Sequence, residues 1–243
     1  MRQLDGRRYW LIGASEGLGA ALARELTGQG VHLVLSARSA DRLDDLAATL
    51  PGGAETVVMD VTDEASVQAA ARQVGRVDGM VYLAGVYWPM ASQGWQADEA
   101  VAMADVNFTG LVRVLGQVVP QMVGRDAGHI VITGSLSGFR GLPGAIGYAA
   151  SKAGVMALAE CLHADLHRSG VDVQLVNPGF IRTRLTARND FAMPFLMDPD
   201  KAAAIIARHM TRRRFARNFP TGFSWVFRLS RLLPESVYLR LFA

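Results

Sequence analysis

Tyr148 and Lys152 stand four residues apart at the start of a helical pattern, and their types suit acid–base chemistry. Apolar residues recur at three- and four-residue steps after them, which predicts a helix. Residues four apart on a helix lie side by side on one face. An ammonium beside a phenol stabilises the phenolate, so we expect the pKa of Tyr148 to fall below its ordinary value of about 10. Such a tyrosine can exchange a proton with a carbonyl or alkoxide oxygen near neutral pH.

The composition singles out Lys152. The chain has 25 Lys and Arg residues, and only Lys152 and Lys201 are lysines. Arginine carries a planar, permanently charged fork, whereas lysine offers a compact ammonium whose pKa the surroundings can shift. A lysine at this position therefore indicates that the ammonium itself is needed. The pair alone is also compatible with a half-buried aromatic next to a solvated lysine, so the rest of the chain must decide.

A glycine-rich turn near the N-terminus predicts a phosphate-binding site. Residues 9–12 read as a buried strand, residues 20–26 as a helix and residues 31–35 as a second strand. Such a unit is typical of a dinucleotide-binding fold. Between strand and helix, the free N–H groups of the helix N-terminus would bind a pyrophosphate that the glycines let approach. These glycines are Gly13, Gly17 and Gly19. Their spacing alone also fits a tight turn without a ligand.

Strand and helix patterns alternate along the rest of the chain. Further strands are expected at residues 55–59, 78–83, 129–133 and 171–176, with helices at residues 63–74, 96–124 and from Tyr148 onward. Asp63 is the expected N-cap of the first of these helices. The alternation predicts an α/β fold: a doubly wound Rossmann-type parallel sheet with helices on both faces, formed by residues 1–243 as one domain. Ligands of such sheets bind at the carboxyl ends of the strands. The residues expected there are Gly13, Arg38, Asp60, Gly85, Ser135 and Pro178.

Taken together, these motifs resemble the short-chain dehydrogenase/reductase family in its single-domain, Tyr-x-x-x-Lys form, over about residues 6–185. The glycine turn matches the family's cofactor turn, although Ile12 stands where Thr is usual. The resemblance implies the catalytic residues Asn107, Ser135, Tyr148 and Lys152. It also implies that the cofactor is bound by Gly13, Ser15, Gly17, Leu18, Gly19, Asp60, Val61, Ala84, Gly85, Tyr148, Lys152, Pro178, Gly179, Ile181 and Thr183. No metal is expected.

The resemblance also implies a role for each catalytic residue. In the reductive direction, hydride passes from the reduced nicotinamide to a carbonyl carbon. Ser135 and Tyr148 hydrogen-bond the carbonyl oxygen, and Tyr148 donates the proton. Lys152 lowers the pKa of Tyr148 and holds the ribose hydroxyls on the nicotinamide side. Asn107 anchors a water that passes protons to Lys152.

The sequence departs from the family pattern after the fourth expected strand. The family usually has Asn-Asn-Ala-Gly there, and this chain has Tyr82-Leu83-Ala84-Gly85. Backbone contacts survive this change, but a side-chain amide that braces the end of the sheet is lost. We therefore expect an effect on stability or cofactor affinity at this point of the fold.

The residues after the second strand indicate which nicotinamide cofactor is used. A carboxylate there would bind the ribose 2′-hydroxyl of NAD(H) and repel a 2′-phosphate. The chain instead has Arg38, which can pair bidentately with a phosphate, and Ser36 or Ser39 can add a hydroxyl. This pattern favours NADP(H) over NAD(H). Glu16 in the glycine turn argues the other way, because a basic residue at that point often assists NADP(H) binding.

Residues of about 184–212 form the expected substrate loop. Two Phe, two Met and a Leu lie in its segment 191–197, around Pro194. They can form an apolar lid over a lipophilic substrate, or they can pack on the protein's own core. Trp88, Met90 and Trp95 are candidates for the same cleft.

Charge is unevenly distributed between the body of the chain and its end. Residues 1–200 carry 16 basic and 21 acidic residues, whereas residues 201–243 carry 9 basic and 1 acidic. A basic extension of about residues 219–243 reads as an amphipathic helix pair broken at Pro234. Three roles stay open for it: contact with an anionic membrane surface, cover of a subunit interface, or packing on the domain. Apolar residues lie between its arginines and no nucleic-acid-binding motif is apparent, so nucleic-acid binding is not expected.

The sequence therefore predicts an NADP(H)-dependent carbonyl reductase or alcohol dehydrogenase acting on a lipophilic small molecule. One alternative is a 3-oxoacyl-thioester reductase that acts on acyl carrier protein, and another is a cofactor-binding regulatory protein without turnover. The family resemblance implies a homodimer or homotetramer built on helices of about residues 96–124 and 149–168. No apolar run precedes the first strand, so a signal peptide is not expected. The single Cys161, expected to be a buried inert thiol, suits a reducing compartment, and we expect the protein in the cytoplasm.

Overall fold

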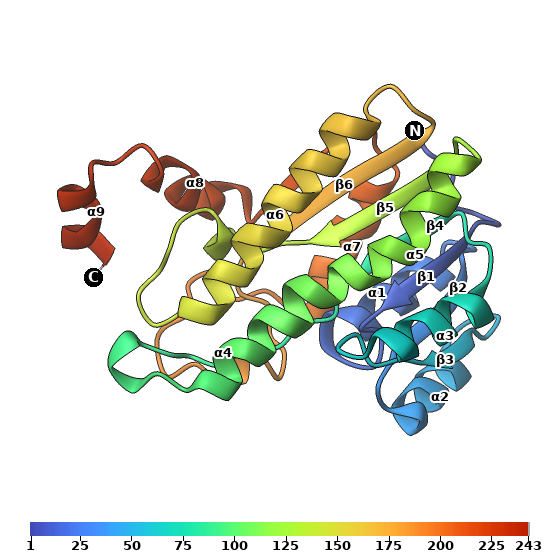
Figure 1. The fold of residues 1–243 in the computed structure, drawn as a ribbon, viewed down its shortest axis with the longest axis horizontal. Coiled ribbons are helices and arrows are strands. Elements are labelled where there is room, and N and C mark those ends of the chain that lie inside the picture. Colours follow the sequence, from blue (N-terminus) through green and yellow to red (C-terminus); the bar gives the residue numbers. More distant parts are fainter. Residues whose placement is uncertain (243) are drawn as a thin grey trace.

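One parallel sheet organises the protein in the computed structural model, which describes residues 1–242 (Figure 1). The strand order is β3-β2-β1-β4-β5-β6-β7, so the order reverses beside β1 and forms a topological switch point. Because all neighbouring strands are parallel, their carboxyl ends meet at one edge, called here the carboxyl edge. The strands are β1 (Arg8–Ile12), β2 (His32–Ala37), β3 (Glu55–Val58), β4 (Gly79–Tyr82), β5 (Gly128–Thr133), β6 (Val171–Pro178) and β7 (Ala216–Phe219).

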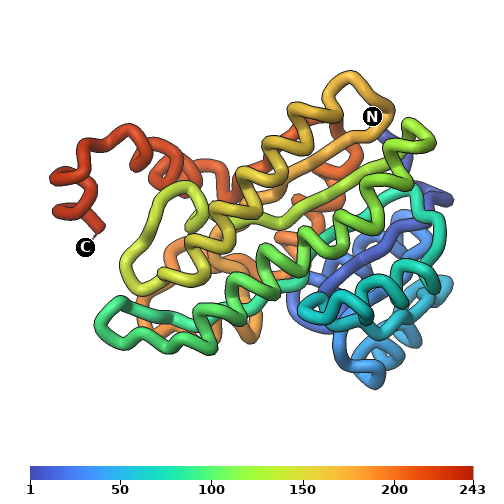
Figure 2. The backbone as a smooth tube through the Cα atoms, in the orientation of Figure 1, coloured from blue at the N-terminus to red at the C-terminus, as the bar shows by residue number. Residues whose placement is uncertain are grey.

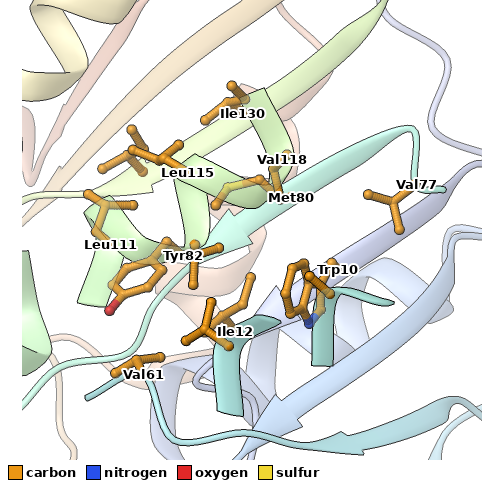
Figure 3. Close-up of a cluster of buried hydrophobic side chains, with 14 of the residues drawn as sticks. Trp10, Ile12, Val61, Val77, Met80, Tyr82, Leu111, Leu115, Val118 and Ile130 are labelled. Atoms are coloured by element: carbon orange, nitrogen blue, oxygen red, sulfur yellow. The ribbon is translucent and has the colours of Figure 1, made fainter. Parts of the chain in front are cut away.

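Helices cover both faces of the sheet, as the strand–helix alternation predicts. Side chains alternate across β1: Trp10 and Ile12 pack with α3 and α5, whereas Tyr9 and Leu11 pack with α1 and α7. Figure 3 shows the first of these layers, with Trp10 and Ile12 facing the helix that carries Leu111. The helices are α1 (Gly17–Thr27), α2 (Ala40–Thr49), α3 (Glu64–Val74), α4 (Ala97–Ala104), α5 (Gly110–Gly124), α6 (Ile146–Leu166), α7 (Pro199–Met210), α8 (Thr221–Ser230) and α9 (Glu235–Phe242).

The long helix expected at residues 96–124 is present, with an irregular turn in its middle. Residues Asp105–Thr109 form a π-helical turn that joins α4 to α5. Asn107 lies at the centre of this turn. Wider turns of this kind occur often at functional sites, because they re-aim side chains within an otherwise regular helix. The apolar periodicity of the segment gives no sign of this turn.

Two local predictions are confirmed: the N-cap of α3 and the helix break at Pro234. Asp63 caps α3 by accepting a hydrogen bond from the Ala65 N–H at 2.9 Å, and α8 and α9 are separated at Pro234.

The short edge strand β7 is not predicted by the hydrophobic pattern of the sequence, because only Phe219 of its four residues is buried. The expectation of a buried Cys161 is wrong: its thiol is exposed. It lies off the buried stripe of α6, which ends with Ala159.

The C-terminal helices stand apart from the sheet. α8 begins directly after β7 at the carboxyl edge, and α9 lies farther out (Figures 1 and 2). Neither helix belongs to the two core clusters that the sheet forms with its covering helices. The extension contacts the body of the protein through a few residues, among them Tyr238, which bonds the Gly141 carbonyl oxygen. The three roles considered for it therefore stay open.

Candidate active site

A cleft of about 610 Å³ opens along the carboxyl edge of the sheet. It crosses the switch point and runs past the ends of β1, β2, β4, β5 and β6. The structure brings all the predicted cofactor-binding residues into its lining. These are Gly13, Ser15, Gly17, Leu18, Gly19, Arg38, Asp60, Val61, Ala84, Gly85, Tyr148, Lys152, Pro178, Gly179, Ile181 and Thr183.

The glycine turn forms a backbone cradle in this cleft. Gly13 has φ +85°, and a Cβ there would lie 2.5 Å from the Ala84 nitrogen. A Cβ on Gly19 would lie 2.0 Å from the Gly13 carbonyl oxygen, so neither position tolerates a side chain. Glu16, the N-cap of α1, makes no side-chain capping bond. The Gly19 N–H bonds the Glu16 carbonyl oxygen, whereas those of Gly17 and Leu18 remain available to an anion, and the cradle fits a dinucleotide pyrophosphate.

Basic and hydroxyl groups lie where the cleft passes β2. Arg38 is exposed and lines the cleft, and Ser39 makes no capping bond to α2. The Ser36 hydroxyl is fully buried and accepts a hydrogen bond from Trp10 Nε1 at 2.8 Å, so it is already engaged. Arg42, one turn into α2, also lines the cleft. Sequence reasoning missed Arg42, although its spacing of four from Arg38 was the available signal.

Glu16 forms ion pairs with two arginines that line the cleft. Its carboxylate accepts a hydrogen bond from Arg42 at 3.1 Å and another from Arg184 at 2.6 Å. All three side chains are at least 40% exposed, so each ion pair contributes little stability. The pairing nevertheless offsets the negative charge of the glycine turn. Glu16 therefore argues less strongly against a ligand that carries a phosphate group there.

Tyr148 and Lys152 lie in the first turns of α6, as their spacing predicts. Lys152 Nζ lies 5.9 Å from the centre of the Tyr148 ring. It donates a hydrogen bond to the Thr133 carbonyl oxygen at 2.9 Å, at the end of β5. Lys152 is buried, and burial lowers its pKa to about 8. Thr133 Oγ1 is buried without a protein partner beside the same cleft, so one more polar contact is left for a ligand.

The expected fall in the pKa of Tyr148 is not found. Burial of the phenol raises its pKa to about 12, a hydrogen bond with Ser135 opposes the rise, and Tyr87 adds to it. Removing the phenolate from water therefore outweighs the stabilisation that the Ser135 hydrogen bond gives to its charge. Tyr148 is therefore protonated at neutral pH and suited to donate its proton.

Ser135 and Asn107 stand behind the cleft surface rather than in its lining. Ser135 leads into the short turn Leu136–Gly138, and its Oγ hydrogen-bonds the Ser137 hydroxyl at 2.7 Å. Asn107 is fully buried. Its amide accepts from the Val86 N–H at 2.8 Å and donates to Ser151 Oγ at 3.0 Å. Asn107 thus joins the segment after β4 to α6, which positions Lys152.

Tyr82 supplies a brace at the point where the sequence departs from the family pattern. Its buried hydroxyl donates to the Val106 carbonyl oxygen at 2.7 Å. A Cβ on Gly110 would lie 2.8 Å from this hydroxyl, so α5 approaches closely only because residue 110 is glycine. The end of β4 is therefore joined to the π-helical turn by a phenol instead of an amide.

Aromatic side chains lie beside Tyr148 and in the substrate loop, outside the lining of the cleft. Tyr87 packs edge-on against Tyr148, with ring centres 5.0 Å apart; sequence reasoning missed Tyr87 because it lies outside any motif. Phe191 and Phe195 of the substrate loop are 47% and 66% exposed, so they do not pack fully on the core. Phe180 links Phe191 to Phe223 of α8. Of the three further candidates, Trp88 stacks under Arg188, Met90 is buried and Trp95 is exposed.

Comparison with known proteins gives the family. The family model described as short chain dehydrogenase matches residues 9–192. The chain belongs to the short-chain dehydrogenase/reductase family. It is an oxidoreductase of this family, whose members use nicotinamide cofactors, and its Rossmann-like sheet is the family's fold.

Relatives extend this similarity over almost the whole chain. A protein of Myxococcus xanthus (strain DK1622), named an uncharacterized oxidoreductase, is 34% identical over 245 residues, which cover 98% of this chain and 97% of the relative. A short-chain dehydrogenase from Streptomyces avermitilis has a TM-score of 0.84 and 27% identity, covering 97% of this chain and 95% of its own. A short-chain dehydrogenase from Sphingobium yanoikuyae in complex with NADPH has a TM-score of 0.82 and 30% identity, covering 88% of both chains.

Proposed function

We propose that this short-chain dehydrogenase/reductase transfers hydride between NADP(H) and a carbonyl or alcohol group of a lipophilic small molecule, with Tyr148 as general acid and base. One observation carries the proposal: Tyr148 and Lys152 of α6 line the cleft beside the glycine cradle at the switch point of the sheet, and Ser135 hydrogen-bonds the Tyr148 phenol from behind the lining. Each of these residues by itself could also have a purely structural role. Because the cradle, Ser135 and the Tyr148–Lys152 pair come from three segments far apart in the sequence, their meeting supports the catalytic role.

The cofactor proposal rests on the residues of the cleft. Bound there, the nicotinamide would supply or accept the hydride. The N–H groups of α1 would hold the pyrophosphate, and Arg38 with Ser39 and Arg42 would hold a 2′-phosphate. The residues directly after β2, Arg38 and Ser39, include no carboxylate that could bind a 2′-hydroxyl in its place. The NADPH complex of the Sphingobium yanoikuyae relative supports the same preference.

In the reductive direction, Tyr148 donates a proton to the carbonyl oxygen while Ser135 hydrogen-bonds the same oxygen. The raised pKa of about 12 keeps the phenol protonated and ready to donate. Lys152 then stabilises the tyrosinate that forms, because an ammonium becomes most effective when a charge develops beside it in a buried site. Asn107 acts through position: it fixes the segment after β4 against α6.

The decisive experiment is a turnover screen with purified protein. NADPH and NADH oxidation would be measured against lipophilic ketones, aldehydes and 3-oxoacyl thioesters, with Tyr148→Phe as the matched control. We expect turnover of an apolar ketone or aldehyde with NADPH. Preferred turnover of thioesters would instead support the acyl carrier protein reductase. Cofactor binding without turnover of any substrate would support the regulatory alternative.

We further propose that the chain acts in the cytoplasm as one domain assembled into a homodimer or homotetramer. The small-molecule substrate is the only other partner that the cleft requires. Val112 and Val123 of α5 are 43% and 48% exposed, which supports a subunit contact on this helix. Light scattering of the purified protein would test the assembly.

A further inference from the structure

The C-terminal helix α8 has a reversed burial pattern. Its buried side chains are Ser224 and Ser230, whereas Trp225 and Leu229 are 47% and 52% exposed. Each serine hydroxyl donates to a backbone carbonyl one turn back, at 2.7 Å, so both are satisfied. A helix that packs only on its own domain buries its apolar stripe instead. The exposed apolar residues of this extension are Trp225, Val226, Leu229, Leu232, Val237, Leu239 and Leu241.

The extension is nevertheless fixed to the body of the protein. Arg140, in the loop that follows Ser135, donates to the Leu233 carbonyl oxygen at 3.1 Å. Its guanidinium also stacks over the ring of Tyr238, 3.8 Å from the centroid. Tyr238 in turn donates to the Gly141 carbonyl oxygen and is the buried residue of α9. These contacts fix the extension to the body of the protein while its apolar residues stay exposed.

The charges around these apolar residues indicate what they contact. Arg228, Arg231 and Arg240 are exposed among them, and Glu235 is the only acid in residues 221–242. The Arg228 guanidinium stacks over the Trp225 ring, 4.1 Å from the centroid. Tryptophan beside arginine, with leucine around both, is suited to the headgroup zone of a bilayer. A second copy of this surface would bring the same positive charges together, with only Glu235 of each copy to offset three arginines.

We propose that α8 and α9 dock in the plane of a bilayer that contains anionic lipids. The apolar side chains enter the acyl boundary and the arginines meet the lipid phosphates. No helix within residues 1–242 is long and apolar enough to cross a membrane. Phe195 of the substrate loop packs against Phe223 of α8, with ring centres 5.4 Å apart. Docking therefore brings the substrate loop to the bilayer, where lipophilic molecules partition.

Vesicle flotation tests this proposal without measuring activity, so its outcome is distinct from that of the catalytic proposal. Full-length protein would be mixed with vesicles of phosphatidylcholine alone or with phosphatidylglycerol added. We expect flotation with the anionic vesicles, weakened by salt because the charges are exposed. The triple variant Arg228→Gln, Arg231→Gln, Arg240→Gln should bind about 100-fold more weakly, since each arginine near an anionic surface contributes about fivefold.

The chain offers a matched control for charge. Arg212, Arg213 and Arg214 are equally exposed and lie before β7, at the opposite edge of the sheet from α8. Replacing these three by Gln removes the same net charge and should leave flotation unchanged. Equal losses in the two triple variants would overturn the proposal, and so would the absence of flotation with anionic vesicles at low salt.

A second pair of substitutions distinguishes a bilayer from a second copy of the chain. Leu229→Ser with Leu232→Ser should abolish flotation while light scattering gives an unchanged mass. Thermal melting would establish that the variant is folded. A halved mass with undiminished flotation would mean that this surface covers a subunit interface, and the membrane proposal would then be wrong.

Discussion

The two edges of the sheet carry similar polar side chains that are used in opposite ways. At the amino edge, the Tyr9 hydroxyl bonds His129 Nδ1 at 2.7 Å, and His129 Nε2 bonds Gln174 at 2.9 Å. The Gln174 amide donates to backbone carbonyls of His209, in the last turn of α7, and of Arg212 and Arg214 after it. Arg2 completes the network by pairing with the partly exposed Asp172. Tyr9, His129 and Gln174 are buried, and every member of the network is bonded within the protein.

At the carboxyl edge the polar groups are only partly bonded. Lys152 has one protein partner, and Thr133 Oγ1 has none although it is buried. An unsatisfied buried polar group costs free energy, so it persists where a ligand can satisfy it. The difference between the edges is one of saturation: the polar groups of the amino edge bond one another and stabilise the fold, whereas those of the carboxyl edge keep bonding capacity that a ligand can use.

Among the substitutions that test the difference between the two edges, Tyr148→Phe should have the largest effect. Loss of the proton donor should lower kcat by about 1,000-fold, within the range of general acid–base catalysis. The melting temperature and cofactor affinity should stay near those of the parent. Steady-state kinetics, calorimetric melting and cofactor titration measure the three quantities. Normal turnover in this variant would remove Tyr148 from the mechanism.

Lys152→Arg should lower kcat by about 100-fold, because a guanidinium cannot take the place of a compact, buried ammonium. In the parent, reduction should decline as pH rises above about 8, where Lys152 loses its proton. The variant keeps its charge at high pH, so its profile should lack this decline. Profiles of kcat/KM against pH for the two proteins make the test; identical declines would assign the titration to another group.

Tyr9→Phe removes a phenolic hydroxyl at the amino edge, as Tyr148→Phe does at the carboxyl edge. It should lower stability and leave catalysis unchanged. His129 Nδ1 would lose its partner, which should lower the free energy of unfolding by about 1–3 kcal/mol. The kinetic constants should not change, because Tyr9 lies away from the cleft. Chemical denaturation and steady-state kinetics would be compared with those of Tyr148→Phe. If Tyr9→Phe impaired catalysis without lowering stability, the amino and carboxyl edges would not differ in role as described.

Arg38→Gln should give the smallest effect. Loss of a charged hydrogen-bond donor to a 2′-phosphate should weaken NADPH binding by about tenfold and leave NADH binding unchanged. Arg7→Gln serves as a control, because Arg7 is also exposed but lies at the amino edge. Fluorescence titration with each cofactor measures both affinities. Equal weakening for NADPH and NADH would mean that Arg38 does not contact the 2′-phosphate.

Local spacing accounts for what the sequence predicted well. The helix that carries Tyr148, the cap at Asp63 and the break at Pro234 each depend on residues within a few positions, and all three are present. What the sequence missed depends on segments far apart. Glu16 meets Arg184 across 168 positions, and no periodicity marks such a pair. The wrong direction for the pKa of Tyr148 has the same origin, because burial is decided by distant segments that pack around the phenol.

By itself, the sequence determined the parallel sheet, the glycine cradle and the phenol–ammonium pair on one helical face. Those features follow from side-chain periodicity, from the missing Cβ of glycine and from the pitch of the helix. Only the tertiary structure decided which polar groups are saturated, which aromatic rings meet Tyr148 and which apolar residues stay outside the core. Packing brings residues from distant segments within a few ångströms of one another, and it is this packing that fixes burial, hydrogen-bond partners and charge stability.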